Sequence, residues 1–327
     1  MVRIFFWAAD SSGCAYYRCE LSAAQLAKRG HEVLVNTVMP PEWLNSADII
    51  VGQRVCQPGV TARWQRLAKE GRVKLVYEID DDLLDIDHWN GPAHSFFGQP
   101  EIRANVIRNI EAADLVTVST AQLAEVVSEY NRNVAVLPNC IPEALLTTQR
   151  PVAEQTTIGW SGGASHKLDL AELGSALTQF IRRYPEVGLH IIGDAKAASQ
   201  LTKGINERAR FTPWVESVPD FHAVIDFDIT LAPLRPSKFN RSKSHIRPLE
   251  AAALGIPVVA SDFGPYAEFV RHGETGLLVK RPHEWSKYLR QLLDSSTRLE
   301  MGANARKLAQ YHTIEHNIEL WEKALCI

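Results

Sequence analysis

The chain has 327 residues, of which 46% are apolar and 22% are charged, and its formal net charge is −3. Such a length predicts two domains, and the composition is that of a globular protein rather than a disordered or membrane-spanning one. Residues 1–150 hold 14 Lys and Arg against 18 Asp and Glu, and residues 151–327 hold 21 against 20. Neither half is basic enough for general binding to a nucleic-acid backbone.

Membrane insertion and secretion are also disfavoured. No apolar run reaches the ~18 residues that cross a bilayer. The apolar start of the chain is too short for a signal peptide and predicts a buried first strand instead. The five cysteines lack metal-type spacing, so we expect reduced thiols and a cytoplasmic location.

Short apolar runs alternate with amphipathic helical patterns along the first part of the chain. Runs that are apolar on both faces are typical of parallel strands, and strands alternating with helices predict a doubly wound α/β domain over residues 1–145. The runs lie at residues 2–8, 31–38, 47–53, 73–79, 114–120 and 133–139.

A second series of strands follows a linker. Residues 140–157 mix prolines with polar side chains and have no sustained period. The later alternation predicts a second Rossmann-like domain over residues 156–305, and residues 306–327 predict a C-terminal helix that packs back toward the first domain. The later runs lie at residues 157–162, 188–195, 208–212, 226–234, 256–261 and 275–280.

The loops at the carboxyl ends of the strands are the candidate ligand sites. Gly13, after the first strand, lies in a loop of small residues that either presents backbone N–H groups to an anion or is a plain turn. A G-x-G-x-x-G fingerprint is absent there, which disfavours a nicotinamide or flavin enzyme. The first loop of the second domain combines small residues, a helix N-terminus and cations, and so predicts a phosphate site. Its candidates are Gly162, Gly163, His166 and Lys167.

A cationic segment in the second domain ends on one carboxylate. Residues 235–247 contain five Lys and Arg and no acid. Ser244 is a candidate cap for the following helix, and Glu250 then falls in its first turn. The cations would hold a diphosphate while Glu250 accepts hydrogen bonds from ribose hydroxyls; alternatively, Glu250 pairs with Arg247 on the helix face.

The segment LEAAALGIPVVASDFGPYAEFVRHGETGLLV, residues 249–279, resembles the donor site of family 4 glycosyltransferases, which are retaining enzymes of the glycosyltransferase-B fold. The resemblance is specific in residues 226–279 and looser elsewhere. It implies two Rossmann-like domains facing across a cleft. It also implies that Glu250 holds the donor ribose and that Gly162, Gly163 and Lys167 grip the diphosphate, with His166 replacing a usual arginine.

The same resemblance places the cationic segment over the diphosphate and sugar. Lys243 and Ser244 lie in the covering loop, and Arg247 is a further candidate for the diphosphate. The family usually has a second glutamate eight residues before Glu250, but this chain has Ser242 there. Together with Asn240, the segment resembles a subgroup that writes F-N-x-x-K-S here and Y-E-I-D-D-D in the first domain.

The consecutive residues Asp80, Asp81 and Asp82 offer three interpretations. They resemble a metal-binding Asp-x-Asp motif, or orient the acceptor hydroxyl, or form a solvated acidic turn. The tandem domains disfavour the metal site, because in this architecture cationic side chains and helix dipoles neutralise the leaving diphosphate. We assign Lys243, Asp80, Asp82 and His94 as catalytic candidates, expect no metal and no cofactor, and note Tyr16, Tyr17, Arg18 and Arg54 as further cleft candidates.

The sequence thus predicts a glycosyltransferase that moves a sugar from a nucleoside diphosphate sugar to a hydroxyl acceptor with retention of configuration. The acceptor stays open between a glycan, a lipid-linked sugar, a protein and a modified nucleobase. The alternative is a protein that binds a sugar nucleotide without catalysis, a reading motivated by Ser242.

Overall fold

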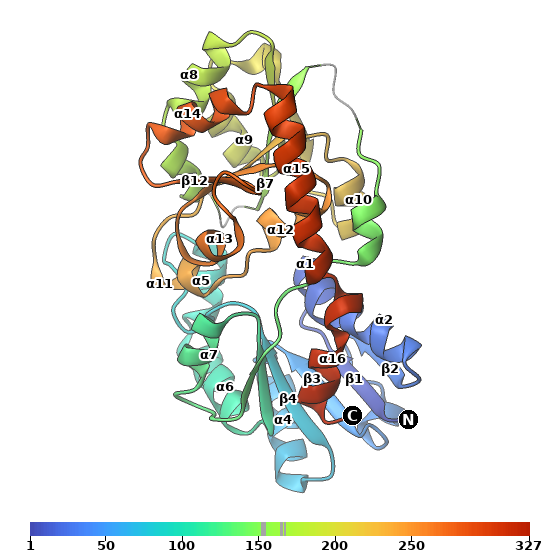
Figure 1. Cartoon of the computed structure of the whole chain (residues 1–327). Coiled ribbons are helices and arrows are strands. Elements are labelled where there is room, and N and C mark those ends of the chain that lie inside the picture. The colour runs from blue at the N-terminus through green and yellow to red at the C-terminus, as the bar shows by residue number, and fades with distance from the viewer. Residues whose placement is uncertain (152–154, 164–165, 167) are drawn as a thin grey trace. The chain divides into compact units, whose positions relative to one another are not determined.

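The computed structural model describes residues 1–151, 155–163, 166 and 168–327. It divides into two compact units: the first comprises residues 1–142, 242–244 and 313–327, and the second residues 143–241 and 245–312. Within the described residues, each unit is built on one six-stranded parallel sheet (Figure 1). The predicted fold class of two Rossmann-like α/β units is confirmed.

The first sheet has the strand order β2-β1-β3-β4-β5-β6. In this order the chain leaves β1 toward opposite sides, so the point between β1 and β3 is the topological switch at which open α/β sheets bind ligands. The strands are β1 (Arg3–Trp7), β2 (Glu32–Asn36), β3 (Ile49–Gln53), β4 (Lys74–Ile79), β5 (Leu115–Val118) and β6 (Val134–Val136).

Helices cover both faces of the first sheet. The connecting segments are α1 (Gly13–Ala15), the π-helical η1 (Tyr16–Glu20), α2 (Leu21–Lys28), α3 (Pro41–Leu44), α4 (Pro58–Glu70), α5 (Gly91–Phe97), α6 (Pro100–Glu111) and α7 (Ala121–Val127). Alternate strand residues enter separate cores, with Phe5 on one face and Phe6 on the other. The C-terminal α16 (Ile314–Leu325) belongs to this unit, beside α2 (Figure 1), and its Trp321 ring lies 5.8 Å from that of Phe6.

The second sheet has the strand order β12-β11-β10-β7-β8-β9. Counted from its own first strand this is the 3-2-1-4-5-6 order of the Rossmann fold, whose ligand crevice lies between the strands corresponding here to β7 and β10. The strands are β7 (Thr156–Gly162), β8 (Val187–Gly193), β9 (Ala209–Pro213), β10 (Ile229–Ala232), β11 (Val258–Ser261) and β12 (Gly276–Val279).

The helical segments of the second unit connect these strands. They are η2 (Glu143–Thr147), η4 (Asp169–Leu173), α8 (Ala176–Arg183), α9 (Ala195–Thr202), η5 (Asn206–Arg208), α10 (Val218–Ala223), α11 (Lys238–Ser242), α12 (Ile246–Ala253), α13 (Gly264–Phe269), α14 (Glu284–Gln291), α15 (Ser295–Ala309) and η6 (Gln310–His312). Among the described residues, no helix is long and apolar enough to cross a membrane.

Two local predictions in the cationic segment are wrong. The segment is not a continuous loop, because α11 forms within it, and Ser237 Oγ accepts the Asn240 backbone N–H at 3.1 Å as a capping residue does. The cap of α12 is His245 rather than Ser244. As a result Glu250 is the fifth residue of α12 and is buried, with 8% of its surface exposed, rather than lying in an open first turn.

Candidate functional site

In the second unit, the loops after β7 and β10 meet at one buried carboxylate. Asp169 Oδ2 lies 2.7 Å from His166 Nδ1, and Asp169 Oδ1 accepts the Arg235 backbone N–H at 3.0 Å and Asn240 Nδ2 at 2.9 Å. One side chain thus joins the segment after β7, the segment after β10 and helix α11. Sequence reasoning missed Asp169, although its spacing three residues after His166 is a local signal for a contact on one helical turn.

Arg247 lies at the carboxyl end of β7. A Cβ atom on Gly162 would lie 2.8 Å from Arg247 Nη2, so the glycine permits this close approach. The guanidinium lies 5.9 Å from the centroid of the Trp160 ring and hydrogen-bonds the phenol of Tyr266. Its Nη1 is buried and has no hydrogen-bond partner within the part of the chain that the structure describes. An unpaired buried donor on a cation suits an anionic ligand oxygen.

Burial raises the pKa of Tyr266 to about 12, against the lowering influence of Arg247. Tyr266 is therefore a neutral hydrogen-bonding partner at physiological pH and leaves the positive charge of Arg247 in place. Arg247 is therefore the candidate anion-binding residue at this strand end. The sequence analysis had placed more weight on Lys243 as the cation that acts on the diphosphate.

Glu250 follows Arg247 by three residues on α12, so both side chains lie on one face of the helix. Its Oε1 lies 3.1 Å from Nε2 of His222, a buried residue of α10. Sequence reasoning missed this contact with His222 and considered Arg247 as a partner of Glu250. A cation and a carboxylate on one helix face match the needs of a diphosphate and a ribose.

Other predicted donor residues have mixed placements. Gly163 is half-buried after β7, beside His166. The predicted phosphate ligand Lys167 lies outside the described residues.

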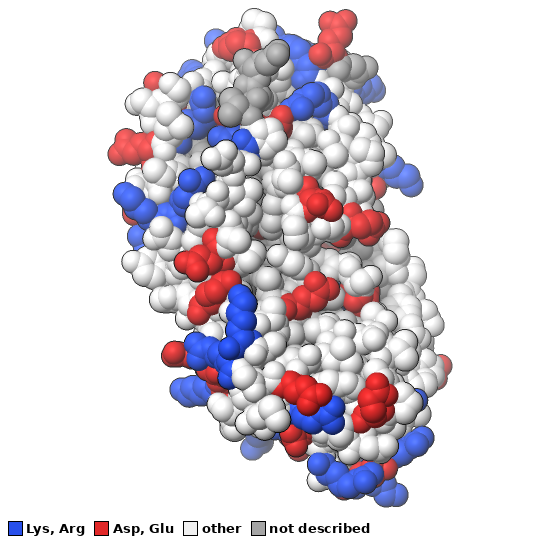
Figure 2. Space-filling view, turned by 90° about the vertical axis from the view of Figure 1, so that its right-hand side faces the viewer, with Lys and Arg blue, Asp and Glu red and all other residues white. Residues whose placement is uncertain are grey.

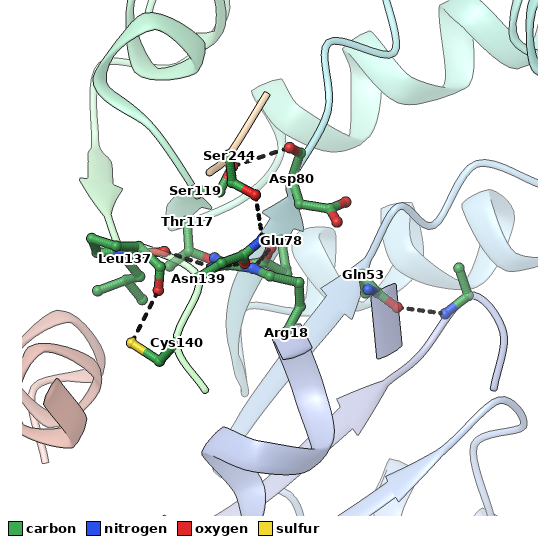
Figure 3. A network of polar contacts seen from close by, with 12 residues as sticks. Arg18, Gln53, Glu78, Asp80, Thr117, Ser119, Leu137, Asn139, Cys140 and Ser244 are labelled. Carbon is green, nitrogen blue, oxygen red and sulfur yellow. Dashed lines mark hydrogen bonds and ion pairs between the residues drawn. The ribbon is translucent and has the colours of Figure 1, made fainter. Parts of the chain in front are cut away.

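Residues Ser242–Ser244 are grouped with the first unit. The backbone oxygen of Ser242 accepts Thr120 Oγ1 at 2.8 Å, and Ser244 Oγ accepts Asn139 Nδ2 at 2.8 Å (Figure 3). The Ser244 hydroxyl, predicted to cap α12, therefore accepts a hydrogen bond from Asn139 instead. Lys243, between the two serines, is half-buried and its charge acts on Asp81.

The three aspartates after β4 differ in environment. Asp82 Oδ1 accepts the Leu84 backbone N–H at 3.1 Å and so shapes the turn. Asp80 is buried, and its Oδ1 has no partner among the described residues. Burial and the neighbouring Asp80 raise the pKa of Asp81 to about 6, although Lys243 and Arg54 oppose the shift. Burial also raises the pKa of Asp82. The buried, unpartnered Oδ1 of Asp80 and the raised pKa of Asp81 are the features that single out these two carboxylates as candidates for a functional role.

Arg18 is not a ligand candidate, which corrects the sequence-based expectation. Its guanidinium pairs with Glu78, and its Nη1 donates to the Leu137 backbone oxygen at 2.6 Å and to Asn139 Oδ1 at 2.9 Å (Figure 3). Glu78 Oε2 also accepts Thr117 Oγ1 at 2.6 Å. The network occupies the interior of the first unit and serves its stability.

The remaining candidates of the first unit lie on two short helices. Gly13 is half-buried at the start of α1, which has only three residues before η1. His94 is exposed on α5.

All five cysteines are free thiols. No group of three or more His, Cys, Asp or Glu that could hold a metal ion is found among the described residues.

The charges on the molecular surface are interspersed. On the face that Figure 2 shows, basic and acidic side chains alternate with uncharged ones, and the described residues form no broad patch of one sign there. This agrees with the charge balance of the sequence.

Comparison with known proteins relates the second unit to sugar transfer. Residues 155–295 match the family described as "Glycosyl transferases group 1". The D-inositol 3-phosphate glycosyltransferase of Rhodococcus erythropolis is 42% identical over 74 residues, or 22% of this chain and 17% of the relative. The lipopolysaccharide core biosynthesis mannosyltransferase LpsB of Rhizobium meliloti is 34% identical over 95 residues, or 28% and 25%. The matched segments thus span a quarter or less of these relatives.

The fold is shared over the whole chain. The Anabaena protein HepE, solved in complex with UDP, has a TM-score of 0.71 and 16% identity, and each chain is covered in full. Its complex with UDP-glucose gives a TM-score of 0.69. The two Rossmann-like units therefore have the glycosyltransferase-B fold.

Proposed function

We propose that this protein is a glycosyltransferase that moves a sugar from a nucleoside diphosphate sugar to a hydroxyl acceptor. The observation that carries the proposal is that Arg247 and Glu250 lie on one face of α12. The Arg247 guanidinium approaches Gly162 closely, and its Nη1 is buried without a hydrogen-bond partner in the described part of the chain. In this assignment Arg247 binds the diphosphate and Glu250 accepts hydrogen bonds from the ribose hydroxyls. The family match of the same unit supports it.

The proposed reaction transfers the sugar from a phosphate oxygen to the acceptor oxygen. The bond between the anomeric carbon and the β-phosphate oxygen breaks, and a bond to the acceptor oxygen forms. The acceptor proton passes to the departing diphosphate oxygen on the same face of the sugar, which retains the configuration. Fixed cations stabilise the charge that develops on the diphosphate, so Arg247 and Lys243 act by electrostatics and positioning. Neither a metal nor a cofactor is part of this proposal.

A non-catalytic sugar-nucleotide-binding protein is the second candidate. The observation that favours it is Ser242, which stands where the resembling family has its first donor-site glutamate; its backbone oxygen is bonded to Thr120. The acceptor of a catalytic protein also remains a proposal. The curated relatives suggest a phosphorylated polyol, as in D-inositol 3-phosphate, beside a glycan, a lipid-linked sugar, a protein or a modified nucleobase.

The test is to titrate UDP and UDP-glucose into the protein by calorimetry and to follow UDP release with and without acceptors. Arg247→Ala should weaken UDP binding tenfold to a hundredfold, since a hydrogen bond to a charged group contributes ~1.5–3 kcal/mol. The matched control is Arg290→Ala, which removes an exposed arginine of α14 in the same unit. Equal affinities of both variants and the parent protein would reject the donor site. UDP binding without turnover over a broad acceptor panel would favour the second candidate.

A further inference from the structure

A pocket of about 270 Å³ opens at the switch point of the first sheet, where β1 and β3 end. Its wall includes Trp7, Asp10, Arg54, Val60, Phe96 and Phe97. Drug-sized ligands occupy pockets of ~300–1,000 Å³. This pocket therefore suits a group of about one sugar ring rather than an extended chain.

One side of the pocket is polar. Arg54 Nη2 lies 2.6 Å from Asp10 Oδ2, while Arg54 Nε is buried without a partner in the described structure. Arg54 also has a φ of 49°, the left-handed region that non-glycine residues rarely adopt. Strained backbone is concentrated at ligand sites. The strain and the unpartnered donor are independent indications of a bound group.

Other residues of the pocket wall are apolar. Phe96 and Phe97 on α5 are half-buried and lie edge to face, with 4.9 Å between their ring centroids. Val60 on α4 is half-buried, and Trp7 keeps its indole Nε1 bonded to the Thr37 backbone oxygen at 3.0 Å. The apolar wall is thus held in place before any ligand binds.

We infer that this pocket binds the acceptor as an uncharged sugar ring, an inference that rests on the glycosyltransferase function proposed above. A sugar ring has hydroxyl groups along its edge and C–H groups on its faces. In the proposed complex the hydroxyl groups donate hydrogen bonds to Asp10 and accept them from Arg54, and the C–H groups pack on the aromatic wall.

The charges select against a phosphorylated acceptor. Arg54 is the only cation among the described residues of the pocket wall, and Asp10 already neutralises it. Asp80 and Asp81 also act on the Arg54 charge from the end of β4. A phosphate dianion beside Arg54 would therefore be repelled by these carboxylates.

The experiment compares methyl α-glucoside with glucose 6-phosphate in the presence of saturating UDP. Binding is measured by saturation-transfer NMR and calorimetry. We expect methyl α-glucoside to bind at least tenfold more tightly and with little dependence on salt concentration. Tighter binding of glucose 6-phosphate, or binding of neither compound, would overturn the inference.

Variants locate the bound sugar. Phe97→Ala removes part of the aromatic wall, and Val60→Trp fills the pocket without emptying the core; each should weaken methyl α-glucoside binding at least fivefold. Phe211→Ala is the control, because Phe211 is an exposed aromatic residue of β9 in the other unit. If Val60→Trp binds the sugar as the parent protein does, this pocket is not the site. UDP titrations of the same variants keep the two proposals apart, because no residue of this pocket is assigned to the nucleotide.

Discussion

The guanidinium of Arg18 and the carboxylate of Glu78 form a two-point ion pair inside the first unit, with N–O distances of 2.7 and 2.9 Å. The two side chains are 1% and 0% exposed. Such a pair is costly to bury, and removing one partner leaves an uncompensated charge in the interior.

Arg18→Met should therefore lower the free energy of unfolding by ~3–5 kcal/mol, because Glu78 would lose its counter-charge. Urea denaturation followed by circular dichroism measures the change. Arg66→Met, at an exposed position of α4, should shift it by less than ~0.5 kcal/mol. An unchanged midpoint for Arg18→Met would show that the pair does not stabilise the unit.

Glu250→Gln tests the ribose assignment while preserving the size of a buried side chain. The amide is a weaker acceptor than the carboxylate, so UDP affinity should fall tenfold to a hundredfold. The variant should also lose the preference for UDP over 2′-deoxy-UDP, which isolates the hydroxyl contact. Glu268→Gln, exposed on α13, is the control. A preference retained in Glu250→Gln would contradict the assignment.

Lys243→Ala should lower turnover more than it weakens donor binding. The negative charge on the diphosphate grows as the glycosidic bond breaks, so a cation that meets it contributes more in the transition state than in the ground state. Steady-state kinetics and UDP titrations separate the two effects. Lys238→Ala, an exposed cation in α11, controls for general charge. Similar mild losses in both variants would remove Lys243 from the catalytic group.

Asp81 should make the stability of the protein depend on pH. Its pKa in the folded state is about 6, against an ordinary value of 3.8, so the folded state binds more protons between these values. Stability should therefore fall as pH rises from about 4 to about 6. Asp81→Asn should flatten that part of the curve and be more stable than the parent above pH 6. Thermal unfolding across this range measures both, and parallel curves would refute the shift.

Chelation tests the interpretation of the acidic turn. If Asp80 and Asp81 contact the acceptor rather than a metal, sugar transfer should persist in excess EDTA. Loss of transfer, with recovery on adding Mn²⁺ or Mg²⁺, would establish the Asp-x-Asp interpretation instead.

The strands were predictable because short apolar runs alternate with helical patterns. All twelve predicted runs correspond to strands of the described structure, including β2, β6 and β9, which are not buried on both faces. Helix α11 was missed, although Ser237 three residues before Asn240 is a local capping signal. The sequence reasoning gave weight to the cations of this segment and overlooked its helix-start pattern.

Other features depend on contacts between residues that are distant in the chain. The sequence makes Arg18 a cleft candidate, but its side chain is buried and forms an ion pair with Glu78, 60 residues away. Ser244 does not cap α12 because Asn139, 105 residues away, bonds its hydroxyl. Local patterns carry no information about such pairs. The sequence therefore yields candidate residues for the site, but it does not identify the distant residues that they contact.

The three contacts of Asp169 make the two loops of the donor crevice mechanically dependent on each other. Under the proposed function, a nucleotide that displaced His166 would therefore also act on Arg235 and Asn240 through Asp169. Double-mutant cycles between His166 and Asn240 would then show large coupling energies that vanish once Asp169 is replaced. In evolution, substitutions at these positions would be tolerated together rather than singly.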